Sequence, residues 1–251
     1  MSERGYQYDF SKDNAAMHSA DGRRRKAFTM LAVLRDALGD EGLATARILN
    51  VGCSTGLIDD VLAEQAGSVV GIDIDRSAVE SARARCARAN LEFRLDDAMA
   101  LNFPDHSFDV VICSQVYEHV PDPSQMMAEI HRVLAPHGVC YFAATNRLCV
   151  MEQHYRLPFL SVIPVRWAHR YLSLCGRGSY YHERHMTLWE LHRLTATFNV
   201  DDYTHRLLAE PERYGTRYMM NSVIKRIVAF SLSRAAYWAF PGYVWLLRKQ
   251  A

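Results

Sequence analysis

The sequence predicts an α/β fold with a doubly wound, mostly parallel sheet, and the order of its first two apolar runs is the main reason. Residues 48–51 form a short apolar run that leads straight into a glycine turn over residues 52–56. A helix-like segment (57–66) and a second apolar run (68–72) follow, and that run ends in Asp73. Strand, glycine turn, helix, strand and acid is the order of a βαβ nucleotide-binding unit.

The glycines and the acid each have a physical task in such a unit. Gly52 and Gly56 let the backbone turn tightly and approach a ligand closely. Asp73 follows the first glycine by about twenty residues, where an acid accepts hydrogen bonds from ribose hydroxyls. The segment therefore predicts a site for a ligand that contains a ribose.

Taken alone, the string Gly52-Cys53-Ser54-Thr55-Gly56 leaves several classes of protein open. A dinucleotide fold would carry a third glycine, and a Walker loop would carry G-K-[ST], which the sequence lacks. A hydrolase nucleophile elbow built on Ser54 would need a triad acid and a histidine later in the chain. An ordinary βα turn without a ligand is the remaining interpretation.

Later segments decide among the possibilities, because more strands and motifs follow in order along the chain. They are, in order, a strand at 92–95 that ends in Asp96-Asp97-Ala98, the segment 101–114 with a fourth strand that ends at Ser114, the residues Tyr117-Glu118-His119-Val120, an amphipathic helix to Leu134, and a strand at 139–144. Together with the first two strands they make five between residues 47 and 146. With these segments in place the chain strongly resembles the class I S-adenosylmethionine (SAM) dependent methyltransferases.

Within that class the chain looks most like the branch that includes quinone-biosynthesis O-methyltransferases and many sugar and natural-product methyltransferases. The resemblance covers roughly residues 47–146. It implies a Rossmann-like sheet of seven strands with an antiparallel last strand. It also implies SAM as the cofactor and S-adenosylhomocysteine as the product of the reaction.

The resemblance assigns cofactor contacts residue by residue. The loop passes beneath the methionine part of SAM, Asp73 holds the ribose, Ile74 packs on the adenine face, and Asp97 accepts from adenine N6. The full set is Asn50, Gly52, Cys53, Gly56, Asp73, Ile74, Asp97, Ala98, Ser114 and Gln115. Two positions depart from the family pattern: Asn50 replaces an acid and Ser54 replaces a glycine. We expect both changes to weaken SAM binding without abolishing it.

Composition excludes some other functions. The 251 residues carry a formal net charge of +1, so no general attraction to nucleic acid is expected. The six cysteines form no C-x-x-C pair, which favours reduced thiols and a cytoplasmic location. The first 20 residues are polar, so no signal peptide is expected, and no stretch is apolar enough to span a bilayer.

We divide the chain into four parts. They are an N-terminal helical lead (1–46), the SAM-binding core (47–146), a substrate cover (147–185), and the remainder of the sheet with its helices (186–251). In the lead, a helix is expected over 22–38, and the basic run 22–26 is interpreted as its solvated start. In the last part, we expect a helix over 187–198, capped by Thr187 with Glu190, and strands at 200–208 and 243–248.

The cover is predicted from its position, because ligands of parallel sheets bind beyond the carboxyl ends of the strands. The same proline-bounded aromatic segment is also compatible with ordinary helical packing. A base for the acceptor proton is expected at His119 or His154, although a structural histidine is the alternative at each position. In some quinone methyltransferases acids and this histidine hold a divalent metal; Gln115 replaces one acid here, so no metal is expected.

The segment 220–240 is apolar, aromatic and basic. It fits a helix on a membrane surface, and it equally fits a core helix or a contact in a homodimer. From all of this we predict O-methylation of a saccharide, a lipid-linked acceptor or another small molecule. A quinone or polyphenol O-methyltransferase and a SAM-binding protein without catalysis are the alternatives.

Overall fold

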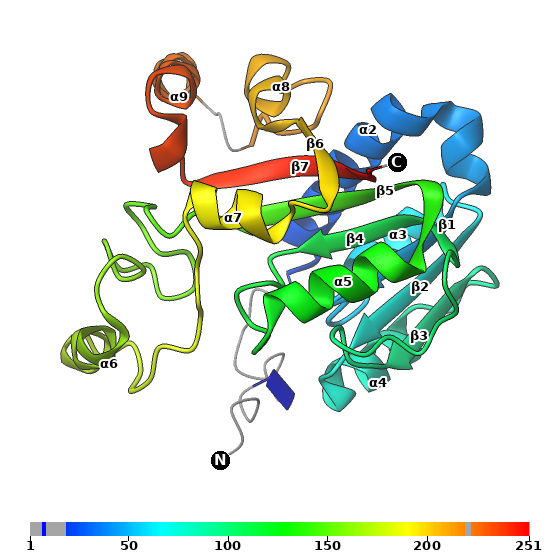
Figure 1. The fold of residues 1–251 in the computed structure, drawn as a ribbon, viewed down its shortest axis with the longest axis horizontal. Coiled ribbons are helices and arrows are strands. Elements are labelled where there is room, and N and C mark those ends of the chain that lie inside the picture. Colours follow the sequence, from blue (N-terminus) through cyan, green and yellow to red (C-terminus); the bar gives the residue numbers. More distant parts are fainter. Residues whose placement is uncertain (1–6, 9–18, 219–221, 251) are drawn as a thin grey trace.

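The structure is a computed structural model that describes residues 7–8, 19–218 and 222–250. Its centre is a seven-stranded sheet in the order β3-β2-β1-β4-β5-β7-β6 (Figure 1). The strands are β1 (Arg47–Val51), β2 (Ser68–Asp73), β3 (Leu91–Leu95), β4 (Phe108–Ser114), β5 (Leu134–Thr145), β6 (Phe198–Asp202) and β7 (Gly242–Lys249). Strand β1 pairs in parallel with β2 and β4. Strand β7 runs antiparallel to both of its neighbours, β5 and β6. The predicted fold class is confirmed.

Helices cover both faces of the sheet. They are α2 (Ala20–Thr45), α3 (Leu57–Ala63), α4 (Arg76–Arg85), α5 (Pro123–Val133), α6 (Val165–Leu174), α7 (Leu188–Leu194), α8 (Thr204–Ala209) and α9 (Val223–Ala235), with a short 3₁₀ turn at Tyr237–Ala239. Figure 1 shows α5 and α7 on one face and α2 and α3 on the other. Each pair buries its apolar side chains against the strands in a separate cluster.

The helix at 187–198 begins as predicted. The Thr187 side chain accepts from the Glu190 amide, and the Glu190 carboxylate accepts from the Thr187 amide, which completes a capping box. The helix ends at Leu194, earlier than predicted, because the chain enters β6 at Phe198.

The strand predicted at 200–208 is partly wrong. Strand β6 ends at Asp202, and its carboxylate accepts from the Thr204 amide at 2.8 Å. The backbone turns helical at Tyr203, and α8 follows. A short polar side chain that caps a helix competes with continuation of the strand, which accounts for the difference.

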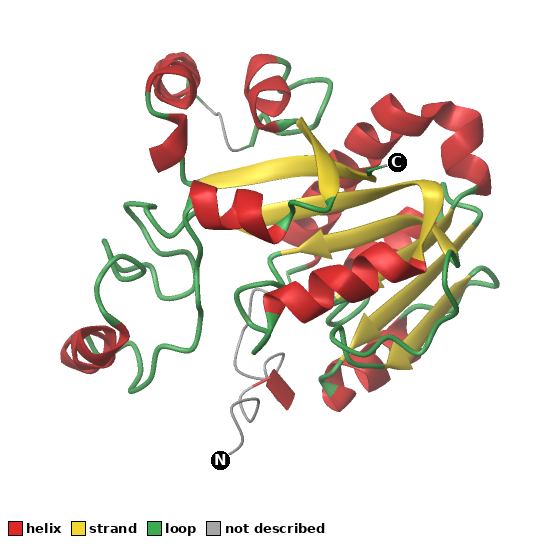
Figure 2. Ribbon diagram, in the orientation of Figure 1, coloured by secondary structure: helices red, strands yellow, loops and turns green. Residues whose placement is uncertain are grey.

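The predicted cover leaves the sheet at the carboxyl end of β5 (Figure 1). Figure 2 shows that most of segment 147–185 is loop, with α6 as its helix. It has a small apolar cluster of its own, which includes Leu160, Leu172 and Tyr181. Its start and end are tied together, because the Arg147 amide donates to the Met186 carbonyl at 2.9 Å.

Some sequence predictions concern segments that the structure describes only in part or not at all. Residues 1–6 and 9–18 of the N-terminal lead lie outside the description, as do residues 220 and 221 of the segment 220–240. Within the described part of the chain, no helix has the length and apolar character needed to cross a membrane. The six cysteines all lie in the described part and are all free.

Tyr117 joins the end of β4 to two other segments. Its side chain is buried, and its hydroxyl donates to the Thr145 carbonyl at 2.6 Å and accepts from the Met186 amide at 3.2 Å.

We predict that Tyr117→Phe lowers the free energy of unfolding by about 1–3 kcal/mol, because the Thr145 carbonyl and the Met186 amide lose this partner. Urea unfolding measures the change. Tyr180→Phe, at an exposed tyrosine, is the control and should be neutral; equal effects would contradict the role of Tyr117.

Candidate functional site

The glycine loop between β1 and α3 is fastened to the end of β2. The amides of Gly52 and Cys53 both donate to the Ile72 carbonyl at 2.9 Å. Gly52 and Gly56 have positive φ angles of 74° and 75°, which L side chains rarely adopt. A Cβ atom on Gly56 would lie 2.5 Å from the Phe93 ring, so this position has no room for a side chain.

Asp73 ends β2 directly beside this loop. Its Oδ2 accepts from the Ser54 amide at 2.8 Å, and its Oδ1 accepts from the Asp75 amide at 2.9 Å. Burial raises the pKa of Asp73 above its ordinary value, and the two amide bonds oppose that rise. A carboxylate held in this way has a defined direction and keeps lone pairs for a ligand's hydroxyl groups.

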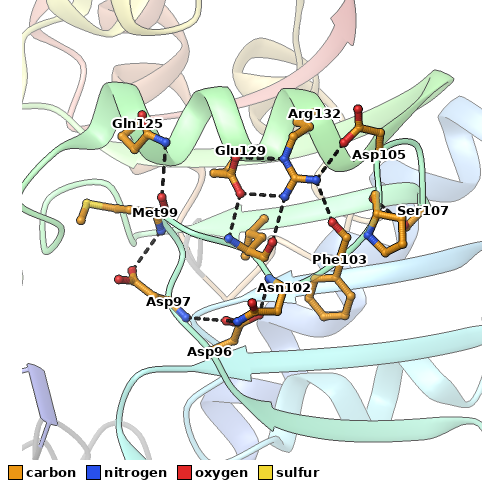
Figure 3. Close-up of polar contacts among 12 residues, drawn as sticks. Asp96, Asp97, Met99, Asn102, Phe103, Asp105, Ser107, Gln125, Glu129 and Arg132 are labelled. Carbon is orange, nitrogen blue, oxygen red and sulfur yellow. Dashed lines mark hydrogen bonds and ion pairs between the residues drawn. The ribbon is translucent and has the colours of Figure 1, made fainter.

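Asp96 and Asp97 differ in what their side chains do. Asp96 is buried and accepts from the Asp97 amide and from the amide and side chain of Asn102, at 2.8–3.1 Å. The Asp97 side chain is half-buried and accepts from the Met99 amide at 3.0 Å (Figure 3). Asp96 therefore shapes the loop, which supports the sequence-based choice of Asp97 as the ligand contact.

Hydrogen bonds and one ion pair, between Arg132 of α5 and Asp105 of the loop at 2.9 Å, clamp this loop to α5. Arg132 donates to the carbonyls of Leu101 and Phe103 at 2.8 and 2.7 Å and pairs with Glu129 at 2.7 Å (Figure 3). Glu129 in turn accepts from the Leu101 amide at 2.8 Å. The predicted adenine side of the site is thus held by both backbone and side-chain bonds.

The missing acid at Asn50 is compensated from α3. The Asn50 amide donates to both oxygens of Asp59 at 3.0 Å, and both residues are buried. Burial raises the pKa of Asp59 to about 7. The carboxylate that the family carries on β1 is replaced here by one on the first turn of α3. The sequence offered no signal for this pair beyond the unusual asparagine itself.

Arg23 is a second residue that sequence reasoning missed. The basic run 22–26 was predicted to be solvated, and Arg24 and Arg25 are exposed, but Arg23 is half-buried. Burial lowers the pKa of Arg23, while the nearby charges of Asp59 and Asp73 raise it. The start of α2 therefore brings a cation to the glycine loop.

The remaining predicted cofactor residues lie beyond the carboxyl ends of β2, β3 and β4. Ile74 follows Asp73, and Ala98 follows Asp97. Ser114 ends β4, and Gln115 takes a positive φ of 59° beyond it. The Gln115 amide donates to the Ala143 carbonyl at 2.9 Å, and its side chain accepts from Thr145 at 2.7 Å, which ties β4 to β5.

Both predicted base candidates belong to one polar cluster. The rings of His119 and His154 lie 5.2 Å apart, edge to face. Burial lowers the pKa of His119 to about 3, whereas the pKa of His154 is raised by its contact with Glu152 despite burial. His154 Nδ1 lies 2.8 Å from Glu152 Oε1, and His185 Nε2 lies 3.3 Å from the same oxygen.

The cluster also contains donor sets that the sequence did not predict. Glu152, His154 and His185 form one group of metal-ligand atoms within 4.8 Å of one another, and Glu118, His119 and His154 form a second. The signals in the sequence were Glu152-Gln153-His154 in the cover and His185, the last residue of the cover. Their convergence depends on the path of the cover, which a single sequence does not reveal.

The buried Asp59 predicts a pH effect on stability. Asp59 keeps its proton up to about pH 7 in the fold but ionises near pH 4 when unfolded, so the unfolded state binds fewer protons between these values. The free energy of unfolding therefore falls as pH rises from about 4 to 7. We expect Asp59→Asn to remove this component, so that its stability relative to the wild type is higher at pH 8 than at pH 5.

Urea unfolding at both pH values measures the difference. The control is Asp40→Asn, at a largely exposed acid, whose stability relative to the wild type should be the same at both pH values. If the difference in free energy of unfolding between Asp59→Asn and the wild type is the same at both pH values, the raised pKa of Asp59 is contradicted.

Comparisons with known proteins agree with this geometry. Residues 49–142 match the model of the family described as "Methyltransferase domain". The ubiquinone biosynthesis O-methyltransferase of Psychrobacter arcticus is 30% identical over 159 residues, which is 61% of this chain and 58% of the relative. That of Pseudomonas fluorescens is 34% identical over 110 residues, or 42% of this chain and 47% of the relative.

The chain spans about half the length of the curated relatives it matches. A solved structure of an S-adenosylmethionine dependent methyltransferase from Mesorhizobium loti has a TM-score of 0.58 at 16% identity. The match covers 88% of this chain and 98% of that one, and it shows a shared fold. The sheet order, the glycine loop and these matches agree: residues 49–142 form a methyltransferase domain, within a fold shared with a SAM-dependent methyltransferase.

Proposed function

We propose that the chain transfers the methyl group of SAM to an oxygen of a saccharide, a lipid-linked molecule or another small molecule. The observation that carries the proposal is Asp73, held by two amides at the end of β2 and beside a glycine loop that leaves no room for a side chain at Gly56. SAM supplies an electrophilic methyl group, which the acceptor oxygen takes as the carbon–sulfur bond breaks to leave S-adenosylhomocysteine.

The residues present fit the parts of SAM. Asp73 accepts from the ribose hydroxyls and Asp97 accepts from the adenine amino group. Arg23 carries the cation that the methionine carboxylate needs, at the side of the glycine loop where Asp59 and Asp73 lie. The backbone of Gly52 and Cys53 passes beneath the methionine part. Ser114 and Gln115 close the site at the end of β4.

The acceptor binds between the end of β4 and the cover. The Arg184 amide donates to the Glu118 carbonyl at 2.9 Å, which brings the end of the cover against the residues that follow β4. The polar cluster around His119 and His154 lies in the same place and receives the acceptor proton. The contact of Glu152 with His154 favours His154 over His119 for that part.

The quinone alternative is favoured by one observation, since the curated relatives are named ubiquinone biosynthesis O-methyltransferases. The level of identity, 30–34% over part of each chain, supports the methyl donor more strongly than the acceptor. A SAM-binding protein without catalysis is tested by turnover. Conversion of SAM to S-adenosylhomocysteine in the presence of candidate acceptors supports an enzyme, and tight binding without any turnover supports the binder.

The segment 220–240 is kept as a proposed contact surface. In its described part, the exposed fractions of Ile227, Val228 and Leu232 on α9 are 61%, 58% and 40%. Exposed apolar side chains argue against a core helix and leave the membrane surface and a second copy of the chain as partners. A cytoplasmic location remains part of the proposal.

We predict that Asp73→Ala weakens SAM binding by about 2–3 kcal/mol, or roughly 30- to 150-fold, because ribose hydroxyls lose a charged acceptor. Calorimetric titration with SAM measures it. The matched control is Asp75→Asn, since Asp75 accepts from the Ser77 and Ala78 amides at the start of α4. Unchanged affinity in Asp73→Ala would remove the ribose assignment, and tighter binding of NAD than of SAM would remove the cofactor.

The two neighbouring acids should separate binding from stability. We expect Asp97→Asn to weaken SAM binding with little change in unfolding, because an amide donor would face the adenine amino group. Asp96→Asn should lower stability instead, because Asp96 holds Asn102 through both its backbone and its side chain. Calorimetry and urea unfolding on both variants distinguish the roles. The reverse pattern would mean that the assignment is off by one residue.

A further inference from the structure

A buried group of donors in the cover has no role in the proposed cofactor contacts. We name Glu152, His154 and His185 the cover triad. Glu152 Oε1 lies 2.8 Å from His154 Nδ1 and 3.3 Å from His185 Nε2. The side chains of Glu152 and His185 have no exposed surface, and that of His154 is 18% exposed. Three ligand atoms thus converge on one point, from residues up to 33 positions apart.

Backbone bonds hold the triad in place before any ligand arrives. The Tyr155 amide donates to Glu152 Oε2 at 2.7 Å, which turns Oε1 toward the histidines. The Glu152 amide donates to the Leu157 carbonyl at 3.0 Å, and the Arg184 amide donates to the Glu118 carbonyl at 2.9 Å. Such orientation of a ligand by its surroundings is typical of metal sites.

Several buried atoms around the triad have no hydrogen-bond partner among the described residues. They are both carboxylate oxygens of Glu118, Oε2 of Glu183, Nδ1 of His185 and the hydroxyl of Tyr181. Glu118 is 1% exposed and Glu183 is 4% exposed. Leaving buried carboxylates without partners is costly, so Glu118 and Glu183 call for a proton, an ordered water or a nearby cation.

We propose that Glu152, His154 and His185 bind one divalent transition-metal ion. Two imidazoles and one carboxylate are a donor set typical of Zn²⁺ and Fe²⁺, whereas Mg²⁺ prefers oxygen ligands. Glu118 adjoins the site, because His154 also belongs to the group that Glu118 forms with His119. All three ligands come from the cover. The site therefore differs from the metal site of some quinone methyltransferases, which uses the positions of Glu118, His119 and Gln115.

The site would change the part that His154 plays in the proposed reaction. A metal-bound hydroxyl loses its proton at a much lower pH than a free one, so a bound metal would let an acceptor hydroxyl release its proton to water without a protein base. His154 would then be a ligand instead of a proton acceptor. Metal binding itself needs neither SAM nor an acceptor, so it can be tested whether or not the proposed function holds.

The test is a calorimetric titration of the full chain, freed of metal with a chelator, with Zn²⁺ and with Mg²⁺. We expect one tightly bound Zn²⁺ per chain and Mg²⁺ binding weaker by a factor of at least about 100. Co²⁺ should give the visible absorption bands of a nitrogen- and oxygen-bound ion. His185→Gln should remove those bands and lower Zn²⁺ affinity by at least about 100-fold, beyond the 10- to 100-fold typical of outer-shell changes.

Two further variants keep the result decisive. Glu152→Gln retains an acceptor for the Tyr155 amide, and His154→Gln changes the least buried ligand, so one of them stays folded if His185→Gln does not. The control is His169→Gln with His182→Gln, a pair of cover histidines outside the triad, which should leave affinity unchanged. Absence of stoichiometric Zn²⁺ binding, or binding that survives the triad variants, would overturn the proposal.

Discussion

The fastening of the glycine loop to the end of β2 is the interaction on which the rest of the site depends. The Ile72 carbonyl accepts from two consecutive loop amides, and the Asp73 carboxylate accepts from a third. These bonds require the sharp turn that only the positive φ of Gly52 and Gly56 permits without strain. The loop, the acid and the start of α3 are therefore one rigid unit, placed where two parallel strands end.

A buried amide–carboxyl pair lies beside this unit. Asn50 stands on β1 where the family usually has an acid, and its side-chain amide donates to Asp59 of α3. Because Asp59 is fully buried, its charge depends on pH and on Arg23 nearby. The departure at residue 50 moves the carboxylate from strand to helix, and the polarity of the site is kept.

Much of the fold could be predicted from the sequence, because its signals are local. The glycine turn, the apolar runs of β1 and β2 and the capping box at Thr187 each specify their structure within a few residues. Strand β6 was predicted too long because the Asp202 carboxylate accepts from the Thr204 amide, where the backbone turns helical before α8. Propensity reasoning underestimates such local competition.

The residues of the candidate site also divide into those that the sequence predicts and those that it does not. Asp73 ends β2 and Asp97 lies two residues beyond β3, so strand order predicted the place of Asp73 and the family resemblance assigned Asp97. Arg23, Glu152 and His185 were not predicted, because each reaches the site through a tertiary path that spacing does not encode. The proposed acceptor side includes Glu152 and His185 beside the predicted His119 and His154. This is why the sequence indicates the methyl donor more clearly than the acceptor.

The most direct measurement of the central claim is a crystal structure of the chain with bound S-adenosylhomocysteine. The account predicts the ribose hydroxyls on the Asp73 carboxylate and the adenine beside Asp97. It also predicts the methionine carboxylate near Arg23 and the sulfur facing the cover. A nucleoside bound away from the glycine loop, or a loop that rearranges so that Ser54 leaves Asp73, would contradict it.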